Sequence, residues 1–428
     1  MLVHCAAFTP RLARTQAAVF LLMSVFVLLV PRGAQAQAWS FGDWQGHWRT
    51  SYLPSWVPGA ALCAASVTSA MDSELSAIRT TPSVQARVAN IVRTSAYGWG
   101  TILGIFDAGL VVNPDSSLIG GDEELEEMAD IYLADANAVA MAMGWGATLV
   151  GVPGYSGTNE DAIVVLNSDG DVHVFAREQS GILPAASLPW PAGYELATTL
   201  SPPSLPAGTT VRHYCDVEML ANGDVVVTFA QNPTYSLSGS TYLREGYIRY
   251  DRAAGAWETP VTTIAGFTLL HPTKTGAFAR QSCISVDYNR SLGRLGFSVN
   301  LDSAGLQRVW LVTYSTSGAF AFFDAVEIDS PATYGVVEDV ALLDANHFLV
   351  QQDNSGADRI RLWSDTSVTH LDEASVVSDL NGLSVSKVND GDGTCVEWIV
   401  YASVQQSTSY PVGADCASFM SVPLERCP

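Results

Sequence analysis

The chain has 428 residues, of which 48% are hydrophobic and 15% are charged, and it contains 35 Gly and 20 Pro. This composition can bury a large core and excludes an intrinsically disordered chain. Acidic residues outnumber basic ones by 43 to 21, which gives a formal net charge of −22. A surface of this sign repels phosphate backbones, so we expect no nucleic-acid partner and interpret the charge as a solvated acidic surface.

Residues 1–36 have the pattern of a secretory signal peptide. Arg11 and Arg14 precede an uninterrupted apolar run from Ala17 to Val30, and Ala34-Gln35-Ala36 fits a small-x-small cleavage site. The run is shorter than the roughly twenty residues that span a bilayer. We therefore expect cleavage after Ala36, no membrane span afterwards, and a secreted, periplasmic or cell-surface protein.

Residues 37–136 form an N-terminal segment that is harder to interpret. It opens with large aromatic residues between Trp39 and Trp56, which we expect to pack in a core rather than to stack on sugars. The apolar residues of 84–92 fall on one face of a helix, and so do those of 122–132, whose first turn is acidic. These two patterns predict short helices within an irregular first blade or a small cap.

A clear β pattern spans residues 214–263. Val225 and Val227 alternate with other residues along a strand, and Asn222-Gly223 suits a tight hairpin turn. A second hairpin follows, with Ala253-Ala254-Gly255 at its turn. Four antiparallel strands in about fifty residues are typical of one propeller blade.

Similar units recur, with first strands near residues 138, 214, 283, 337 and 384. In the first of them we expect a GWG turn at residues 144–146 between two strands. The last unit is one strand short, and a strand from the N-terminal segment would complete it and remove an exposed sheet edge. We therefore predict an all-β protein, a β-propeller over residues 137–428 with six blades, or seven as the alternative.

Six cysteines remain after cleavage, an even number in a chain that meets an oxidising compartment, so we expect disulfides. Cys395 and Cys416 lie in the last unit and are a predicted local pair, while the pairing of Cys215 with Cys283 is left open. No cysteine pair or Cys/His cluster has zinc-site spacing, and no cofactor is expected. Asn389 to Gly393 is the nearest sequence to a calcium loop, but it is typical of a plain turn. The six are Cys63, Cys215, Cys283, Cys395, Cys416 and Cys427.

Two segments resemble known propeller repeats. DVEMLANGDVVVTF followed by YIRYDRAAGAWETPVT resembles the repeat of secreted sialidase-like propellers, and VAMAMGWGATLVGVPG followed by DGDVHVFARE resembles an FG-GAP blade of integrin-type propellers. The Ser-x-Asp-x-Gly-x-x-Trp box of sialidases does not appear in full. The sialidase resemblance implies a Tyr/Glu pair and arginines for a substrate carboxylate, for which Tyr214, Glu218, Arg212 and Arg280 are candidates by residue type.

Polar residues on the first strands of successive blades are the candidates for a functional site, because these strands line the central channel of a propeller. Converging carboxylates supply the acid and the base or nucleophile of glycosidic cleavage. The candidates for catalysis are Asp216, Glu218, Tyr214, Asp287 and Glu338, and those for ligand binding are Arg212, His213, Tyr214, Arg280 and Asp339. Acids on such strands also commonly fix neighbouring blades together.

Three functions remain open at this point. The first is an exported propeller that binds a glycan or a protein through the channel-face loops. The second is a sialidase-like or other glycoside-cleaving enzyme that uses the channel carboxylates, and the third is a structural surface protein. The sequence has no Walker, GxGxxG, HExxH or GxSxG motif, which removes the usual support for nucleotide binding, zinc proteolysis and the α/β-hydrolase scheme. His173 is expected to be a strand histidine with a local hydrogen bond rather than a ligand.

Overall fold

The structure is a computed structural model, and it describes part of the chain. The expected signal segment and its cleavage site lie outside the described residues, as do Cys63, Arg280, Cys283 and Cys416. The described residues are 38–48, 75–80, 85–93, 101–108, 125–133, 138–147, 160–167, 169–177, 194–201, 205, 212–237, 240–264, 267–268, 270–272, 284–289, 292–303, 306–315, 321–329, 336–353, 359–364, 369–375, 380–389, 395–404 and 417–427.

The protein is all-β, built from several antiparallel sheets, and its described residues include no helix. It follows that no described segment is a helix able to cross a bilayer. Most of the sheets take four strands in chain order, as expected where apolar runs alternate with short polar turns.

The N-terminal region holds a regular sheet where the sequence predicted helices. Its strands are β3 (Leu75–Thr80), β4 (Gln85–Arg93), β5 (Thr101–Ala108) and β6 (Leu125–Leu133). The helices predicted over 84–92 and 122–132 are therefore wrong. Val88 pairs with Phe106 and Ile91 with Leu103, so pairing with β5 decides the conformation of residues whose spacing alone fits a helix.

The second sheet contains β7 (Ala138–Ala147), β8 (Glu160–Asn167), β9 (Val172–Arg177) and β10 (Tyr194–Leu200). The GWG sequence was expected to form a turn, but it lies within β7, where Gly144 pairs with Ala162 and Trp145 with Asp161. A tight turn does follow β8, where the N–H of Gly170 donates to the carbonyl of Asn167 at 2.9 Å and Gly170 has a φ of 96°.

The third sheet matches the hairpins expected between residues 214 and 263. Its turn at Asn222-Gly223 uses a Gly223 φ of 86°, and the N–H of Gly223 donates to the carbonyl of Leu220 at 2.8 Å. The strands are β11 (Arg212–Met219), β12 (Val225–Leu237), β13 (Ser240–Asp251) and β14 (Ala256–Trp257), with β17 (Leu270–Pro272) also paired to β13. A separate two-stranded sheet is formed by β15 (Thr263–Ile264) and β16 (Phe267–Thr268).

Two further four-stranded sheets begin close to the first strands expected near residues 283 and 337. The fourth contains β18 (Val286–Asn289), β19 (Arg294–Ser303), β20 (Leu306–Ser315) and β21 (Ala321–Asp329). The fifth contains β22 (Val336–Leu342), β23 (His347–Asp353), β24 (Arg359–Ser364) and β25 (Thr369–Ser375).

The last sheet combines both ends of the chain. Three strands come from the C-terminal region, namely β26 (Leu380–Asn389), β27 (Val396–Val404) and β28 (Ala417–Cys427). Two more come from the N-terminal region, β1 (Ala38–Phe41) and β2 (Gln45–Trp48), and both pair with β28. A segment near the start of the chain thus covers an edge that would otherwise be open.

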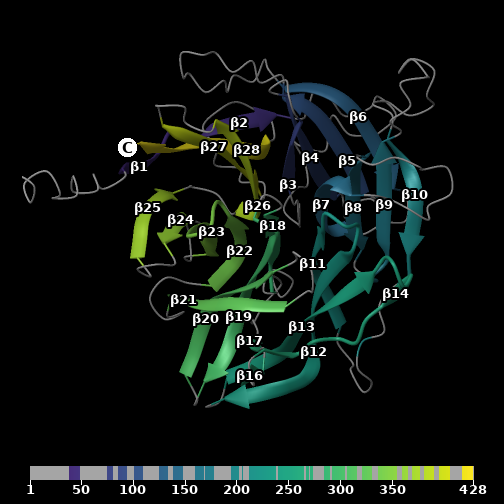
Figure 1. Ribbon diagram of the computed structural model, residues 1–428, viewed down its shortest axis with the longest axis vertical. Helices are drawn as coiled ribbons and strands as arrows, with labels where there is room; N and C mark the ends of the chain where they lie inside the picture. The colour runs from purple at the N-terminus through teal and green to yellow at the C-terminus, as the bar shows by residue number, and fades with distance from the viewer. Residues whose placement is uncertain are drawn as a thin grey trace, which may run out of the picture.

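The first strands of the six larger sheets contact one another in a cyclic order. β3 contacts β7, β7 contacts β11, β11 contacts β18, β18 contacts β22, β22 contacts β26, and β26 contacts β3. In Figure 1 the labels of these six strands cluster near the middle of the view, while outer strands such as β6, β10, β21 and β25 lie toward its periphery. Side chains of the first strands therefore converge although they are far apart in the sequence.

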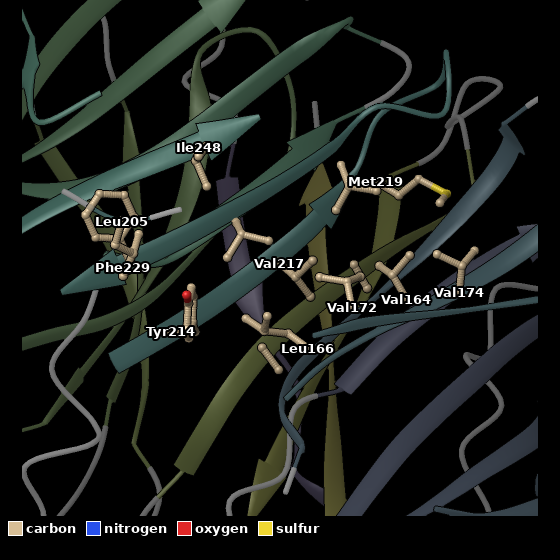
Figure 2. Packing of buried hydrophobic residues seen from close by; sticks show 14 residues of the cluster. Val164, Leu166, Val172, Val174, Leu205, Tyr214, Val217, Met219, Phe229 and Ile248 are labelled. Carbon is tan, nitrogen blue, oxygen red and sulfur yellow. The ribbon is translucent and has the colours of Figure 1, made fainter. Parts of the chain in front are cut away.

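Alternate residues of one strand serve two cores. Val225, Val227 and Phe229 of β12 pack against the second sheet, whereas Val226 packs against the fourth. Figure 2 shows the first of these cores, in which Leu166 and Val172 lie close to Val217 of β11. Because both faces of such a strand are buried, a shift by one residue would exchange the two cores, and the register is strongly specified.

The N-terminal aromatic residues that the structure describes take part in packing. The ring of Trp39 stacks on Trp398, with centroids 5.4 Å apart, and Arg426 lies 5.2 Å above the Trp39 ring. Phe41 and Trp44 pack against the same core between the fifth and last sheets. The backbone N–H of Phe41 also donates to Asp372 of β25 at 3.1 Å, which fixes β1 to the neighbouring sheet.

The last sheet is crosslinked at its outer end. Cys395 is bonded to Cys427, with Cα atoms 4.2 Å apart, so the predicted pair of Cys395 with Cys416 is wrong. The reason is register: Val396 pairs with Arg426 across β27 and β28, which brings the two flanking cysteines together. Cys215 is also disulfide-bonded, and its partner lies outside the described residues.

Replacing Cys395 and Cys427 together by Ser should lower the free energy of unfolding. The bond closes a loop with a sequence separation of 32 residues. The loss of loop-closure entropy from the unfolded chain then predicts about 3–4 kcal/mol. Urea unfolding of the double variant and the wild type measures this difference. Equal stability of the two proteins would contradict the structural role assigned to the bond.

Candidate functional site

The candidate site lies along the converging first strands, four of which have a backbone irregularity. Pairing with the second strand shifts register after Ala138 in β7, after Tyr214 in β11, after Val337 in β22 and after Asn381 in β26. A β-bulge bends its strand and redirects side chains, and bulges are common beside functional sites. In β11 the shift falls on Cys215 and Asp216, so it re-aims one of the predicted site residues.

Asp216 connects the third sheet to the fourth. One of its carboxylate oxygens accepts the N–H of Val217 at 2.7 Å, and the other accepts the N–H of Val286 in β18, also at 2.7 Å. The residue is 5% exposed. Nearby, the hydroxyl of Thr228 donates to the carbonyl of Ile284 at 2.6 Å, so the junction contains a second direct bond between the two sheets.

Asp287 and Asp339 continue the same pattern at the next two junctions. The place where the six first strands converge is called the axis below. Asp287 of β18 accepts the N–H of Leu342 in β22 at 2.7 Å. Asp339 of β22 accepts the N–H of Leu383 in β26 with one oxygen. With its other oxygen it accepts its neighbour Val340 at 2.7 Å and the hydroxyl of Ser285. Three successive junctions are thus made by a carboxylate on one first strand and a backbone N–H on the next.

Glu218 belongs to the same acidic cluster but is bound more loosely. It is partly exposed, and in its one described hydrogen bond its carboxylate accepts from the N–H of Met219 at 3.2 Å. Burial raises the pKa of Glu218 well above its usual value, and the charges of Asp287, Asp216 and Asp339 raise it further. The Glu218 carboxyl therefore retains its proton at a higher pH than an ordinary glutamate and can act as a hydrogen-bond donor.

Asp287 is the second partly exposed acid of the cluster. Burial raises the pKa of Asp287 to about 7, against the hydrogen bond from Leu342, which lowers it, and the charge of Asp216 adds to the rise. Burial likewise raises the pKa of Asp339, followed by the charge of Asp216. We define Asp216, Glu218, Asp287 and Asp339 as the axial carboxyl cluster.

The other predicted site residues have different surroundings. Tyr214 is 6% exposed and packs in the core of Figure 2, where a Cβ atom on Gly170 would lie 2.4 Å from its ring. Arg212 and His213 begin β11 opposite Gln231 and Ala230, and Glu338 lies at the register shift of β22; the side chains of these three residues are outside the described part.

The two histidines whose contacts are described, His173 and His347, form local hydrogen bonds. His173 of β9 makes two local hydrogen bonds, to the Asn167 amide and to the Thr199 hydroxyl, each at 2.9 Å. Burial lowers the pKa of His173, against the charge of Asp171, which raises it. His347 is bound by Asp344 at 2.7 Å, at the opposite end of the first strands from Arg212. This local bonding of His173 matches the expectation of a strand histidine.

One group among the described residues has the spacing of metal ligands. Cys395, Glu425 and Cys427 lie within reach of a single ion, but the disulfide consumes both thiols and leaves one carboxylate. Of the segment considered for calcium, Asn389 ends β26 and residues 390–393 lie outside the described part.

Sequence reasoning identified the acids but not what they bind. Ser285 was missed: its hydroxyl donates to Asp339 and accepts the N–H of Val340 at 2.9 Å, which ties β22 to the segment before β18. The available signal was a polar residue two positions before Asp287, between Ile284 and Val286. Nothing in the sequence indicates which backbone N–H each carboxylate accepts.

Comparison with known proteins adds a distant likeness only. No protein-family model matches the chain, and no curated protein matches it. Among solved structures, a luciferin-regenerating enzyme has a TM-score of 0.43 and 9% identity over 82% of this chain and 91% of that one. A protein from Lactobacillus plantarum has a TM-score of 0.35 and 9% identity over 70% and 84% of the two chains. An ulvan lyase, described as a polysaccharide lyase bound to a glucuronate–rhamnose sulfate unit, has a TM-score of 0.38 and 7% identity over 81% and 78%.

Replacing Asp216 by Ala should destabilise the protein strongly. The change leaves the N–H groups of Val217 and Val286 without their acceptor in a buried position, at about 1–3 kcal/mol for each group. We expect a total loss of about 2–6 kcal/mol in urea unfolding, and a smaller loss for Asp216→Asn, which keeps one acceptor oxygen. The matched control is Asp251→Ala, which removes an acceptor of the Ala254 N–H at an exposed turn. Equal losses in the two alanine variants would contradict the role of Asp216.

The free energy of unfolding should fall as the pH rises from about 4 to about 7. The pKa of Asp287 rises from 3.8 to about 7 on folding, so in this range the folded state binds more protons than the unfolded state. The stabilisation is fully present below the unfolded pKa and is lost as the pH passes through the folded one. Asp287→Asn should flatten this part of the profile, because an amide does not ionise. Thermal unfolding between pH 4 and 8 measures it, and an unchanged slope would refute the assignment.

Proposed function

We propose that the chain is an exported six-bladed β-propeller that binds a glycan through the axial carboxyl cluster and the loops around it. The cyclic contacts of the six first strands and the pairing of β1 with β28 support the propeller. The apolar run of residues 17–30 and the bond between Cys395 and Cys427 support export to an oxidising compartment.

The observation that carries the proposal is that the two partly exposed acids of the cluster have raised pKa values. Glu218 and Asp287 both have raised pKa values in a cluster that contains two further carboxyls. A carboxyl that holds its proton near neutral pH can donate and accept at once, which is what a sugar hydroxyl requires of its partner. A cluster of four acids also disfavours an anionic group, so the preferred ligand is a glycan that is uncharged where it touches the axis.

The preference for an uncharged ligand distinguishes the proposal from a sialidase, because recognition of a sialic acid requires cations for its carboxylate. Arg212 and Arg280, the arginines considered for that role, have side chains outside the described part, and the four acids described at the axis would repel such a carboxylate. Within the cluster, Asp216 and Asp339 differ from Glu218, because their oxygens are occupied by backbone N–H groups and their exposure is 5% and 6%. Glu218 and Asp287 are the members available to a ligand.

Glycoside cleavage is a second candidate, and the raised pKa of Glu218 favours it. A general acid must carry its proton at the working pH, and an ionised partner must act as base or nucleophile. Glu218 would be the acid, and Asp287, whose pKa is about 7, would be the partner as it ionises. In this reaction the proton of Glu218 passes to the leaving-group oxygen as the glycosidic bond breaks, and a water molecule that gives a proton to the ionised Asp287 bonds to the anomeric carbon.

A glycan array probed with the wild type, Glu218→Ala, Asp287→Ala and Glu218→Gln tests the binding proposal. We expect neutral glycans to be retained by the wild type and by Glu218→Gln, since an amide still donates and accepts, and their affinity to fall at least about tenfold in both alanine variants, which lose the donor and the acceptor. Asp251→Asn is the control, because it changes a carboxylate at an exposed turn and should bind as the wild type does.

The same proteins, assayed on chromogenic glycosides, separate binding from catalysis. Turnover that is lost in Glu218→Gln while binding persists would assign the enzyme. Wild-type affinity for glycans in both axial alanine variants, with unfolding curves that show intact folding, would overturn the axial site. Selective retention of sialylated or uronate-rich glycans would contradict the preference for an uncharged ligand.

A further inference from the structure

A hollow lies away from the axis, between the fourth and fifth sheets. It is at the end where the first strand of each sheet is followed by the turn to its second strand. Its walls come from three segments: the β18–β19 turn with the start of β19, strand β21, and the β22–β23 turn. The space that it encloses is about 20 Å³, so a ligand would lie against its walls with part of its surface toward solvent.

One wall contains an aromatic ring that the backbone directs outward. Phe322 of β21 pairs with Tyr314 and Asp324 pairs with Thr313, so Phe323 is an extra residue at a register shift. A bulge of this kind re-aims a side chain, and the ring of Phe323 is 50% exposed. The hollow continues inward to Leu342 and Phe348, which are 8% and 2% exposed. The hollow therefore has an apolar floor, formed by Leu342 and Phe348, next to the exposed ring of Phe323.

A guanidinium group lies over that ring. The central carbon of Arg294 lies 3.8 Å from the centroid of Phe323, and one nitrogen donates to the carbonyl of Ala345 at 3.2 Å. Among the ion pairs of the described residues, none joins Arg294 to a carboxylate. The contact with the ring and one hydrogen bond restrict the position of the group, and the N–H groups of a guanidinium match the two oxygens of a carboxylate.

The acids in the same walls have other partners. Asp344 accepts from His347 at 2.7 Å, from the N–H of Asn346 at 2.9 Å and from Arg426 at 2.6 Å. Burial opposes ionisation, but these bonds and charges hold the pKa of Asp344 at about 2. Asp324 accepts the N–H of Ala325 in its own strand at 2.8 Å. The charge of Asp344 is thus compensated within the wall, and Arg294 remains the cation without a described ion pair.

We propose that this hollow binds a small organic carboxylate that carries an aromatic ring. The carboxylate oxygens accept from the guanidinium of Arg294, while the ring of the ligand packs on Phe323 and on the apolar floor at Leu342 and Phe348. The site shares no side chain with the axial carboxyl cluster, and it favours an anionic ligand, whereas the cluster disfavours one. It therefore stands independently of the glycan proposal.

Benzoate is the probe, and it is titrated into the full mature chain by isothermal calorimetry, with saturation-transfer NMR as a second readout. A ligand of this size that uses both groups is expected to bind with a dissociation constant of about 1 mM or lower. Acetate, which lacks the ring, and benzyl alcohol, which lacks the carboxylate, should each bind at least about tenfold more weakly.

Arg294→Gln and Phe323→Ala should each weaken benzoate binding at least about tenfold, because one removes the cation and the other the ring that it contacts. The matched control is Arg252→Gln, since Arg252 also donates to a turn carbonyl, that of Asn222 at 2.9 Å, in the third sheet. Both Arg252→Gln and the axial variant Glu218→Gln should bind benzoate as the wild type does.

The proposal is overturned if the wild type shows no saturable binding of benzoate, or if Arg294→Gln binds it with wild-type affinity. Benzyl alcohol binding as tightly as benzoate would also overturn it, because the carboxylate would then contribute nothing. Thermal unfolding of each variant checks folding. Both side chains are at least partly exposed, and Phe323→Ala provides a measurement independent of the arginine.

Discussion

The arrangement of the sheets depends on hydrogen bonds that carboxylates accept from the backbone N–H groups of the next sheet. A β-sheet satisfies its own N–H and C=O groups along the ladders, but the first strand of each sheet has one side without a ladder partner. Asp216, Asp287 and Asp339 supply acceptors for such N–H groups at three successive junctions. A buried N–H without a partner costs about 1–3 kcal/mol, so each carboxylate fixes both the distance and the register between two sheets.

The same bonds explain the chemistry of the axis. Bringing several carboxyls together away from bulk water raises their pKa values, because burial disfavours the charged form and each charge repels the others. The acids with the most backbone bonds are held in place by them. Asp216 and Asp339 are buried and serve the junctions, Glu218 is partly exposed, and Asp287 combines a junction bond with partial exposure. The convergence of the first strands thus produces both the polar junctions between sheets and the candidate site.

Aromatic residues contribute in two different ways. At the outer end of the last sheet, Trp39, Trp398 and Arg426 stack on one another and hold the N-terminal strand β1 against the core. At the neighbouring junction, Phe323 is turned outward by a bulge and carries Arg294 on its face. Both groups combine an aromatic ring with a guanidinium, but only in the second, Phe323 with Arg294, is the aromatic residue half exposed. Exposure, rather than residue type, distinguishes packing from a surface that can bind a ligand.

The sequence by itself determined the local elements. Alternating apolar residues and turns such as Asn222-Gly223 predicted most strands from residue 214 onward, because period-two burial and positive backbone dihedrals are properties of a few adjacent residues. It also identified the acids of the axis. Only the tertiary structure decided that residues 85–93 and 125–133 are strands, because pairing with β5 outweighs a helical spacing that carries little energy alone. The partner of Cys395, the acceptor role of each carboxylate and the contact of Arg294 with Phe323 likewise follow from contacts between strands, which local periodicity does not encode.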